Sequence, residues 1–279
     1  MGDLSTIWKL GVCSVLASIP AFAWGYIFYN KDPQSKRLTL LTFFGGMIAV
    51  IGIIIYKWSW KFFPFMDIFQ FSNRFADSYL GLENIIMIPI SVIVMFMIIG
   101  VIEEYSKNLV VRIVDRGSFK SVDDAIIYSI IAALGFSFVE NILYFFYIWQ
   151  NQSIESLFIP FVFRSIFSTF AHVFFSGIYG YYYGVAYFSK PFWREEIQAN
   201  RGKFVSFLHK ILGLKSQEIF EQTKRAQGLL IAVSLHAVFN VFLEMNWTFL
   251  IVPFLFTGFF VLTSLLDRKE YHKILERID

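Results

Sequence analysis

The chain alternates long apolar runs with short polar connectors. Seven runs approach or exceed the roughly 20 residues that a helix needs to cross the hydrocarbon core of a bilayer. Their expected bounds are 10–29, 38–56, 85–108, 123–149, 160–188, 226–245 and 248–266. The pattern predicts an all-α, polytopic transmembrane helical bundle of about seven spans. We expect it to form a single integral membrane domain over residues 1–279.

The composition agrees with a membrane protein and excludes an ordinary soluble domain. Hydrophobic residues make up 57% of the chain, aromatic residues 20% and charged residues only 16%. Typical soluble domains contain roughly 25% charged residues. The single cysteine, Cys13, rules out an intrachain disulfide. The net charge of +3 is small, and we expect no nucleic-acid partner.

The distribution of Lys and Arg predicts how the bundle is oriented. Basic side chains gather in the connectors 30–37, 109–122 and 189–225 and in the tail 267–279. The connectors 150–157 and 246–247 contain none. Cytoplasmic loops of membrane proteins are enriched in Lys and Arg. We therefore expect the N-terminus outside and the C-terminal tail in the cytoplasm.

Two connectors are amphipathic. Residues 57–84 are dense in Trp and Phe, which predicts an interfacial helix or a re-entrant segment. Residues 190–224 mix aromatic and aliphatic side chains with basic ones, which predicts a helix on the cytoplasmic leaflet. Ordinary packing at the membrane interface is the simpler explanation of both.

Charged residues interrupt the third apolar run. Glu103 and Glu104 lie near its end, and Lys107 follows four and three residues later, so it can reach either carboxylate on a helix. Ionised groups within a bilayer are costly and usually functional. The same residues also suit an anchor where a helix leaves the membrane, so this stretch alone supports both interpretations.

The fourth run carries Glu140 and Asn141 deep among apolar residues. An unpaired carboxylate there would cost several kcal/mol or take up a proton. Phe136 and Tyr144 lie one turn before and after Glu140 on the same helix face. A protonated side chain bonding between helices is the structural alternative to a catalytic glutamate.

The fifth run contains a polar stripe. Arg164, Ser168, His172 and Ser176 recur every four residues, which places them along one side of a helix. Arg164 is near the outer end of this run, so we also consider that its side chain extends to the membrane interface.

The sixth run carries His236 and Asn240, one helical turn apart on one face. A lone histidine in a membrane helix more often bonds to another helix than acts in catalysis. The other histidines, His209 and His272, lie in cytoplasmic segments, and we expect no chemistry from them.

Polar residues on four separate spans predict one shared site, a catalytic core of four helices within residues 85–245. Carboxylates and imidazoles suit general acid–base chemistry, and a His-x-x-x-Asn pair can donate to an oxyanion. Together these groups fit peptide-bond hydrolysis without a Ser or Cys nucleophile. Two His and one Glu also make a catalytic zinc site with an open water position, with His172, His236 and either Glu140 or Glu103 as ligands. The spacing leaves both possibilities open.

Two other classes of protein fit the same residues. Intramembrane Glu and His build proton relays in proton- or cation-coupled transporters, but no inverted repeat of the transporter kind is recognisable. A scaffold or immunity protein that binds a partner through the same pocket is the third interpretation.

The positions of the candidate site residues within their spans predict that these residues lie at different depths in the membrane. Glu103 and Glu104 lie toward the cytoplasmic end of the expected third span, whereas Glu140, His172 and His236 lie deeper in theirs. We therefore expect a water-filled cavity between the third and sixth spans, open toward the cytoplasm or the inner leaflet.

These residues resemble the motifs of the PrsW-type intramembrane protease family, which is related to the CAAX-processing and bacteriocin-processing proteases. The family pattern is Glu-Glu-x-x-Lys, Phe-x-x-x-Glu-Asn, a His before a Gly-rich stretch, and His-x-x-x-Asn. The matching residues, in order, are Glu103, Glu104, Lys107, Phe136, Glu140, Asn141, His172, Gly177, Gly180, His236 and Asn240. The motifs span residues 100–244, about half the chain.

The resemblance implies a bundle of seven or eight helices whose site opens from the membrane. It implies a membrane-protein or lipid-embedded peptide substrate, in the best-known case site-1 cleavage of an anti-sigma factor. A bacterial or archaeal cell membrane is the corresponding location. In the CAAX branch a His stands where this chain has Glu140.

By analogy with the CAAX branch, Glu103 or Glu104 would activate a water molecule, and His236 with Asn240 would hold the oxyanion. His172 would assist the water or bind a metal ion. Lys107, Asn141 and Arg164 are expected to support these groups. We expect a glutamate-based mechanism without a cofactor, and a Zn²⁺-dependent version is the alternative.

Overall fold

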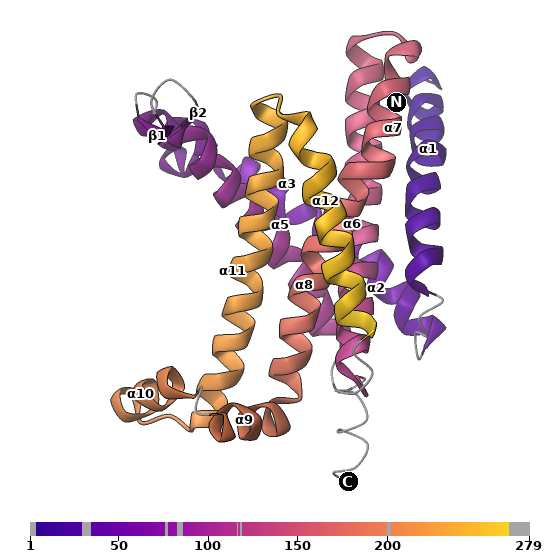
Figure 1. Ribbon diagram of the computed structural model, residues 1–279. Coiled ribbons are helices and arrows are strands. Elements are labelled where there is room, and N and C mark those ends of the chain that lie inside the picture. The colour runs from indigo at the N-terminus through magenta and orange to yellow at the C-terminus, as the bar shows by residue number, and fades with distance from the viewer. Residues whose placement is uncertain are drawn as a thin grey trace.

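The computed structural model is a bundle of long helices that lie side by side, with shorter elements at both ends (Figure 1). The structure describes residues 4–29, 35–75, 78–82, 86–115, 117, 119–199 and 202–267. Residues 268–279 of the predicted tail, including His272, and residues 30–34 of the first basic connector lie outside the described residues.

The helices of the bundle are named in chain order. They are α1 (Leu4–Tyr29), α2 (Lys36–Ala49), α3 (Ile51–Ser59), α5 (Ile90–Asp115), α6 (Val122–Asn151), α7 (Phe158–Phe163), α8 (Thr169–Tyr187), α11 (Ser216–Glu244) and α12 (Thr248–Asp267). α3 continues the direction of α2, and a π-helical turn (η4, Arg164–Ser168) joins α7 to α8. α1 begins at one end of the bundle, and α12 ends at the other (Figure 1).

The prediction of an all-α polytopic bundle is confirmed. Among the described residues, six helical segments are long and apolar enough to cross a membrane. The predicted third span, α5, is not among them, because every 18-residue stretch of α5 contains Glu103, Glu104 and Lys107. Figure 1 shows α5 running along the same bundle as the other spans.

α6 is the centre of the bundle. Of its apolar window 72% is buried, more than in any of the other candidate spans. It contacts α1, α2, α5 and α8, and α8 in turn packs on α11. A capping box begins α6, because the Ser121 hydroxyl accepts from the Asp124 amide while the Asp124 carboxylate accepts from the Ser121 amide.

Glycines let α6 approach its neighbours closely. A Cβ atom added at Gly180 of α8 would lie 2.6 Å from the carbonyl oxygen of Ala125 and 2.7 Å from Cα of Ile126. A Cβ atom at Gly135 would clash with the carbonyl oxygen of Phe43 in α2. Small residues at such crossings let helix backbones pack directly against each other.

The connector before α5 differs from the prediction. Residues 57–84 were expected to form an interfacial helix or a re-entrant segment. The structure instead contains short elements: η1 (Pro64–Met66), α4 (Ile68–Ser72), η2 (Asn73–Phe75), β1 (Tyr79–Leu82) and β2 (Ile86–Pro89). The strands pair antiparallel, with Tyr79 opposite Pro89 and Leu82 opposite Ile86. The hairpin was missed because its two strands are only four residues long.

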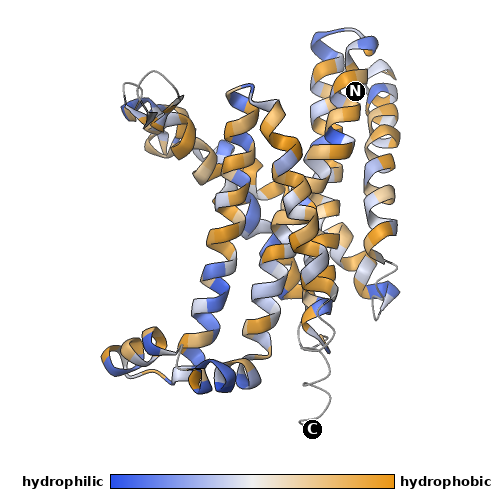
Figure 2. Ribbon diagram, viewed as in Figure 1, coloured by the Kyte–Doolittle hydropathy of each residue, from blue (hydrophilic) through white to orange (hydrophobic). Residues whose placement is uncertain are grey.

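The basic connector after α8 forms two helices, α9 (Ser189–Gln198) and α10 (Lys203–Leu212), where one was predicted. Both lie across the end of the bundle (Figure 1), and hydrophilic residues are concentrated in α9 and in the first turns of α11 (Figure 2). Gly213, whose φ of +67° is left-handed, caps the C-terminus of α10. α11 begins at Ser216, ten residues before the predicted span, because its polar first turns continue the same helix.

The close α6–α8 crossing predicts that Gly180→Ala destabilises the protein. The added methyl group would push two backbones apart, and overpacking of this kind costs about 1–3 kcal/mol. Gly11→Ala is the matched control, because nothing lies within 4 Å of a Cβ atom added there. Thermal unfolding in detergent should show a lower Tm for Gly180→Ala alone. A Tm for Gly180→Ala equal to that of the control would contradict the prediction.

Candidate active site

The polar residues predicted on four spans meet in the middle of the bundle. Glu103 and Glu104 come from α5, Glu140 from α6, His172 from α8 and His236 from α11. The expected mismatch in depth was wrong. α5 continues to Asp115 rather than ending at residue 108, because apolar residues continue beyond Lys107, so the glutamate pair lies near the middle of the helix.

Glu104 is the most enclosed carboxylate of the group. Its side chain is 0% exposed, and it accepts from Lys107 Nζ at 2.5 Å, from His236 Nδ1 at 2.8 Å and from Ser176 Oγ at 3.3 Å. Lys107 is 1% exposed, and its ammonium also lies 5.0 Å from the centre of the Phe136 ring. The interpretation of this stretch as an interfacial anchor therefore does not hold.

The contacts of His172 assign its protons. Its Nδ1 lies 3.3 Å from Lys107 Nζ, and its Nε2 lies 2.9 Å from Glu140 Oε2. An ammonium group only donates, so Nδ1 accepts. A carboxylate accepts, so Nε2 carries the proton and donates to Glu140. His172 is thus a neutral ring whose Nδ1 lone pair faces the Lys107 ammonium.

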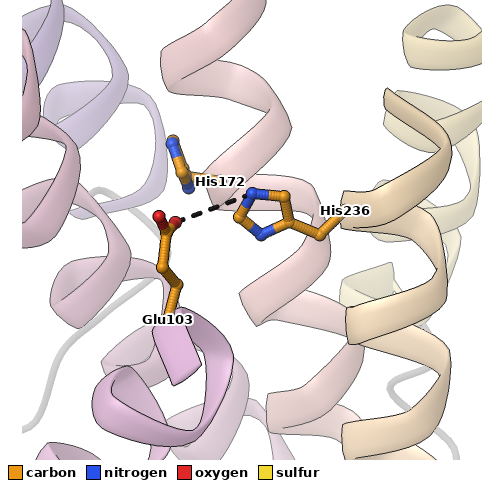
Figure 3. A group of neighbouring side chains, drawn as sticks. All are labelled: Glu103, His172 and His236. Carbon is orange, nitrogen blue, oxygen red and sulfur yellow. Dashed lines mark ion pairs between the residues drawn. The ribbon is translucent and has the colours of Figure 1, made fainter. Parts of the chain in front are cut away.

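His236 has the opposite arrangement. Its Nδ1 donates to the Glu104 carboxylate, which leaves the Nε2 lone pair facing Glu103 Oε2 at 3.6 Å (Figure 3). Glu103 Oε2 is buried and has no hydrogen-bond partner among the described residues. The two histidine rings lie edge to face, with centroids 5.4 Å apart. The free lone pair of His236 and the unpartnered oxygen of Glu103 therefore point at the same small volume.

This volume fits a metal ion. One ligand atom each from Glu103, His172 and His236 lies within 4.8 Å of the other two, and all three residues are buried. Two His and one Glu form a common catalytic zinc donor set that leaves one position open. Each histidine also donates its remaining N–H to a carboxylate, Glu104 or Glu140, as histidine ligands of metals usually do.

Glu140 lies behind His172 and is not in this three-residue group. Its Oε2 is also 2.9 Å from Arg164 Nη2, an ion pair without hydrogen-bond geometry. Arg164 Nε donates to Asn141 Oδ1 at 2.6 Å. Extension of Arg164 to the membrane interface is therefore wrong, because its side chain is 12% exposed and turned inward.

Asn240 lies one turn after His236 on α11 and is half-buried. The structure gives it no hydrogen bond to another described residue. Its role as an oxyanion donor stays a prediction. Because His236 Nε2 faces the site without a proton, Asn240 is the better donor of the pair.

Glu140 is the most exposed carboxylate of the cluster. Glu140 is 33% exposed, whereas the other Glu and His side chains of the cluster are 10% exposed or less. Leu143, Tyr144 and Tyr147, farther along α6, are also exposed. This part of α6 runs away from the end of the bundle that carries α9 and α10 (Figure 1). The first half of α6 is buried along most of its residues, and the expected opening toward the basic end stays a prediction.

Several contacting residues were not predicted as members of the site. The Phe175 ring stacks on the His236 ring, with centroids 5.4 Å apart. The centroids of the Phe136 and His172 rings are 5.6 Å apart. The Thr169 hydroxyl accepts from Asn141 Nδ2 at 3.2 Å. Ser176 had a detectable signal, since it follows His172 by four residues. Thr169 had no such signal, because the helix carries several hydroxyl side chains and the sequence does not single out this one.

The fold and the site together define a polytopic membrane protein with a buried glutamate–histidine centre of the hydrolytic kind. The chain belongs to the PrsW family of intramembrane metalloproteases, whose sequence model matches residues 34–266. It is therefore a membrane-embedded protease, as the motifs predicted, rather than a transporter or a scaffold. A membrane substrate and the lipid bilayer follow as its partners.

The chain is also similar to the protein named Protease PrsW of Clostridioides difficile (strain 630). The two are 24% identical over 244 residues, which cover 85% of this chain and 82% of the relative. No solved structure matches the chain.

The enclosed Lys107–Glu104 pair predicts that Lys107→Met is strongly destabilising, because it leaves a buried carboxylate without its cation. Breaking such a pair costs about 3–5 kcal/mol. Lys215→Met is the matched control, since its pair with Glu218 has the same three-residue spacing but side chains that are 84% and 55% exposed. Its loss should cost only about 0–1 kcal/mol.

Chemical denaturation in detergent measures both changes. The double variant Lys107→Met, Glu104→Gln should recover part of the loss, because it removes the orphaned charge. Equal effects of Lys107→Met and Lys215→Met would show that burial of the pair is unimportant.

Proposed function

We propose that this chain is a metal-dependent endopeptidase that hydrolyses a peptide bond of a membrane-protein substrate at the centre formed by Glu103, His172 and His236. The observation that carries the proposal is the convergence of three buried ligand atoms within 4.8 Å. The carboxylate behind each histidine supports it. Zn²⁺ is the first candidate, because its preferred ligands are those present. When bound, such an ion polarises a carbonyl and activates water.

The protein residues would have separate tasks in this reaction. Glu104, which is paired with Lys107, holds His236 in place. Glu140 fixes the orientation of His172 through Nε2. Asn240 is proposed to donate its amide N–H to the developing oxyanion, which is a large term in acyl-transfer catalysis. Glu104 already accepts three hydrogen bonds, so Glu103 is the carboxylate free to take part in the chemistry.

A metal-free protease is the second candidate, and the position of Lys107 favours it. Lys107 Nζ lies 3.3 Å from His172 Nδ1, the nitrogen that a metal ion would need. In this version Glu103 takes the proton from the attacking water at its unpartnered Oε2. The Lys107 ammonium and the imidazoles stabilise the charge that develops.

Metal analysis separates the two candidates. The purified protein should hold about one Zn²⁺ per chain, and Glu103→Gln, His172→Ala and His236→Ala should each lose both the metal and substrate cleavage. His209→Ala, at an exposed position of α10, is the matched control and should keep both. Full cleavage by the chelator-treated protein would contradict the metal-dependent mechanism and support the metal-free one. Cleavage by Glu103→Gln would overturn both candidates.

We further propose that the substrate is a single-span membrane protein cut on its outer side, with an anti-sigma factor in a bacterial or archaeal membrane as the first class to test. The half-exposed Glu140 supports this, because the accessible side faces away from the basic end of the bundle. The basic residues of α9 and α10 support a cytoplasmic location for that end. A reporter enzyme that is active only outside the membrane should stay inactive when fused after residue 279.

Membrane-protein fragments compared between cells with the wild-type chain and with Glu103→Gln should reveal the substrate. We expect the wild-type cells to shorten one or a few single-span proteins at a bond near the outer membrane surface, because the site is reached from that side. Quantitative mass spectrometry of new termini measures this. New termini only on the cytoplasmic side would contradict the proposed side of cleavage.

A further inference from the structure

The helix that carries His172 contains a π-helical turn just before it. In η4 the amide N–H of Thr169 donates to the carbonyl oxygen of Arg164, five residues earlier. The Thr169 hydroxyl donates to the same oxygen at 2.9 Å. A π-turn absorbs one extra residue into a helix and often marks a functional site. The turn therefore changes which side of the helix Arg164 occupies relative to His172.

The change in direction can be worked out from helix geometry. In a regular α-helix, two residues eight positions apart differ by about 80° in direction. With one residue absorbed by a π-turn, Arg164 and His172 differ by only about 20°. Both can then reach one acceptor, and in the structure they do. Arg164 Nη2 and His172 Nε2 each lie 2.9 Å from Oε2 of Glu140.

The guanidinium of Arg164 is held on several sides. Its Nε donates to Asn141 Oδ1 at 2.6 Å, while Asn141 Nδ2 donates to the Thr169 hydroxyl at 3.2 Å. The guanidinium carbon also lies 4.5 Å from the centre of the Tyr144 ring. These contacts form a closed loop between α6 and the π-turn. Arg164 can therefore hold the Glu140 carboxylate in one orientation.

We propose that Arg164 is a positioning residue that acts on His172 through Glu140. By fixing Oε2 of Glu140 it keeps the proton of His172 on Nε2 and leaves Nδ1, the nitrogen next to Lys107, without a proton. The inference deepens the proposed function, on which it rests for the role of His172. It concerns the orientation and tautomer of one imidazole, so it can be tested without substrate.

The geometry requires arginine rather than any cation. Arg164 donates a hydrogen bond from Nε to Asn141 and forms an ion pair through Nη2 with Glu140, the preceding residue of α6. A lysine offers one ammonium group and cannot make the two contacts from separate nitrogens in a fixed plane. Arg164→Lys should therefore keep the charge beside Glu140 but lose the fork that orients it.

The principal variant is Arg164→Met, which removes the guanidinium and keeps an unbranched side chain. Nitrogen NMR of the metal-free protein with labelled histidine should show His172 as the Nε2–H tautomer in the wild type and as a mixture in the variant. Zn²⁺ affinity, measured by competition with a chelator, should fall by up to about 10-fold, the lower end of the loss expected when a histidine ligand loses its own partner, because Arg164 acts on His172 through Glu140. Arg164→Lys should give an intermediate loss.

Arg74→Met is the matched control, because Arg74 is exposed in η2, far along the chain from the site. It should change neither the NMR signals of His172 nor the Zn²⁺ affinity. Thr169→Val is the second variant, for the case in which Arg164→Met does not fold. It removes the hydroxyl that closes the loop but no charge, and it should shift both measurements in the same direction by a smaller amount.

Three outcomes would overturn the inference: a folded Arg164→Met protein with the wild-type tautomer and affinity, full recovery by Arg164→Lys, or an unchanged His172 in Thr169→Val. Failure of the proposed function looks different. A wild-type protein that binds no Zn²⁺, or that cleaves without it, would contradict the metal-dependent mechanism. The tautomer of His172 in the metal-free protein would still decide the role of Arg164.

Discussion

The burial of Glu104 is the constraint on which the rest of the site depends. A carboxylate with no exposure inside a membrane bundle must be matched by donors from other helices, since water cannot solvate it. Lys107 supplies the charge from the same helix, and Ser176 and His236 supply donors from α8 and α11. These bonds fix how α5, α8 and α11 face one another. The arrangement of the reacting groups follows from that requirement.

Each histidine is oriented by a hydrogen bond to a different carboxylate. Glu104 accepts a hydrogen bond from Nδ1 of His236, and Glu140 accepts one from Nε2 of His172. The Nε2 lone pair of His236 then faces Glu103, and the Nδ1 lone pair of His172 faces Lys107. Oε2 of Glu103 accepts no hydrogen bond from the described residues. Acceptors gathered in this way are suited to a cation or to a proton from water, which is why both mechanisms use the same residues.

Packing places these groups at one level in the membrane. α6 is covered by close crossings with α2 and α8, where glycines bring backbones together. The first half of α6 is closely packed, whereas α6 carries exposed side chains beyond Glu140. The π-turn before α8 then brings Arg164 onto the side of its helix that faces Glu140. The polar cluster thus lies where the buried half of α6 meets its exposed half.

The sequence by itself determined the membrane class, most of the spans and the polar residues that meet inside the bundle, because hydrophobic length and costly charges leave strong local signals. Glu103, Glu140, His172 and His236 stand out in apolar runs for that reason. Only the tertiary structure decided their depth, their proton positions and the inward turn of Arg164. Those features depend on where helices end, on how they cross and on a single π-turn, and none of these follows from the spacing of residues in a regular helix.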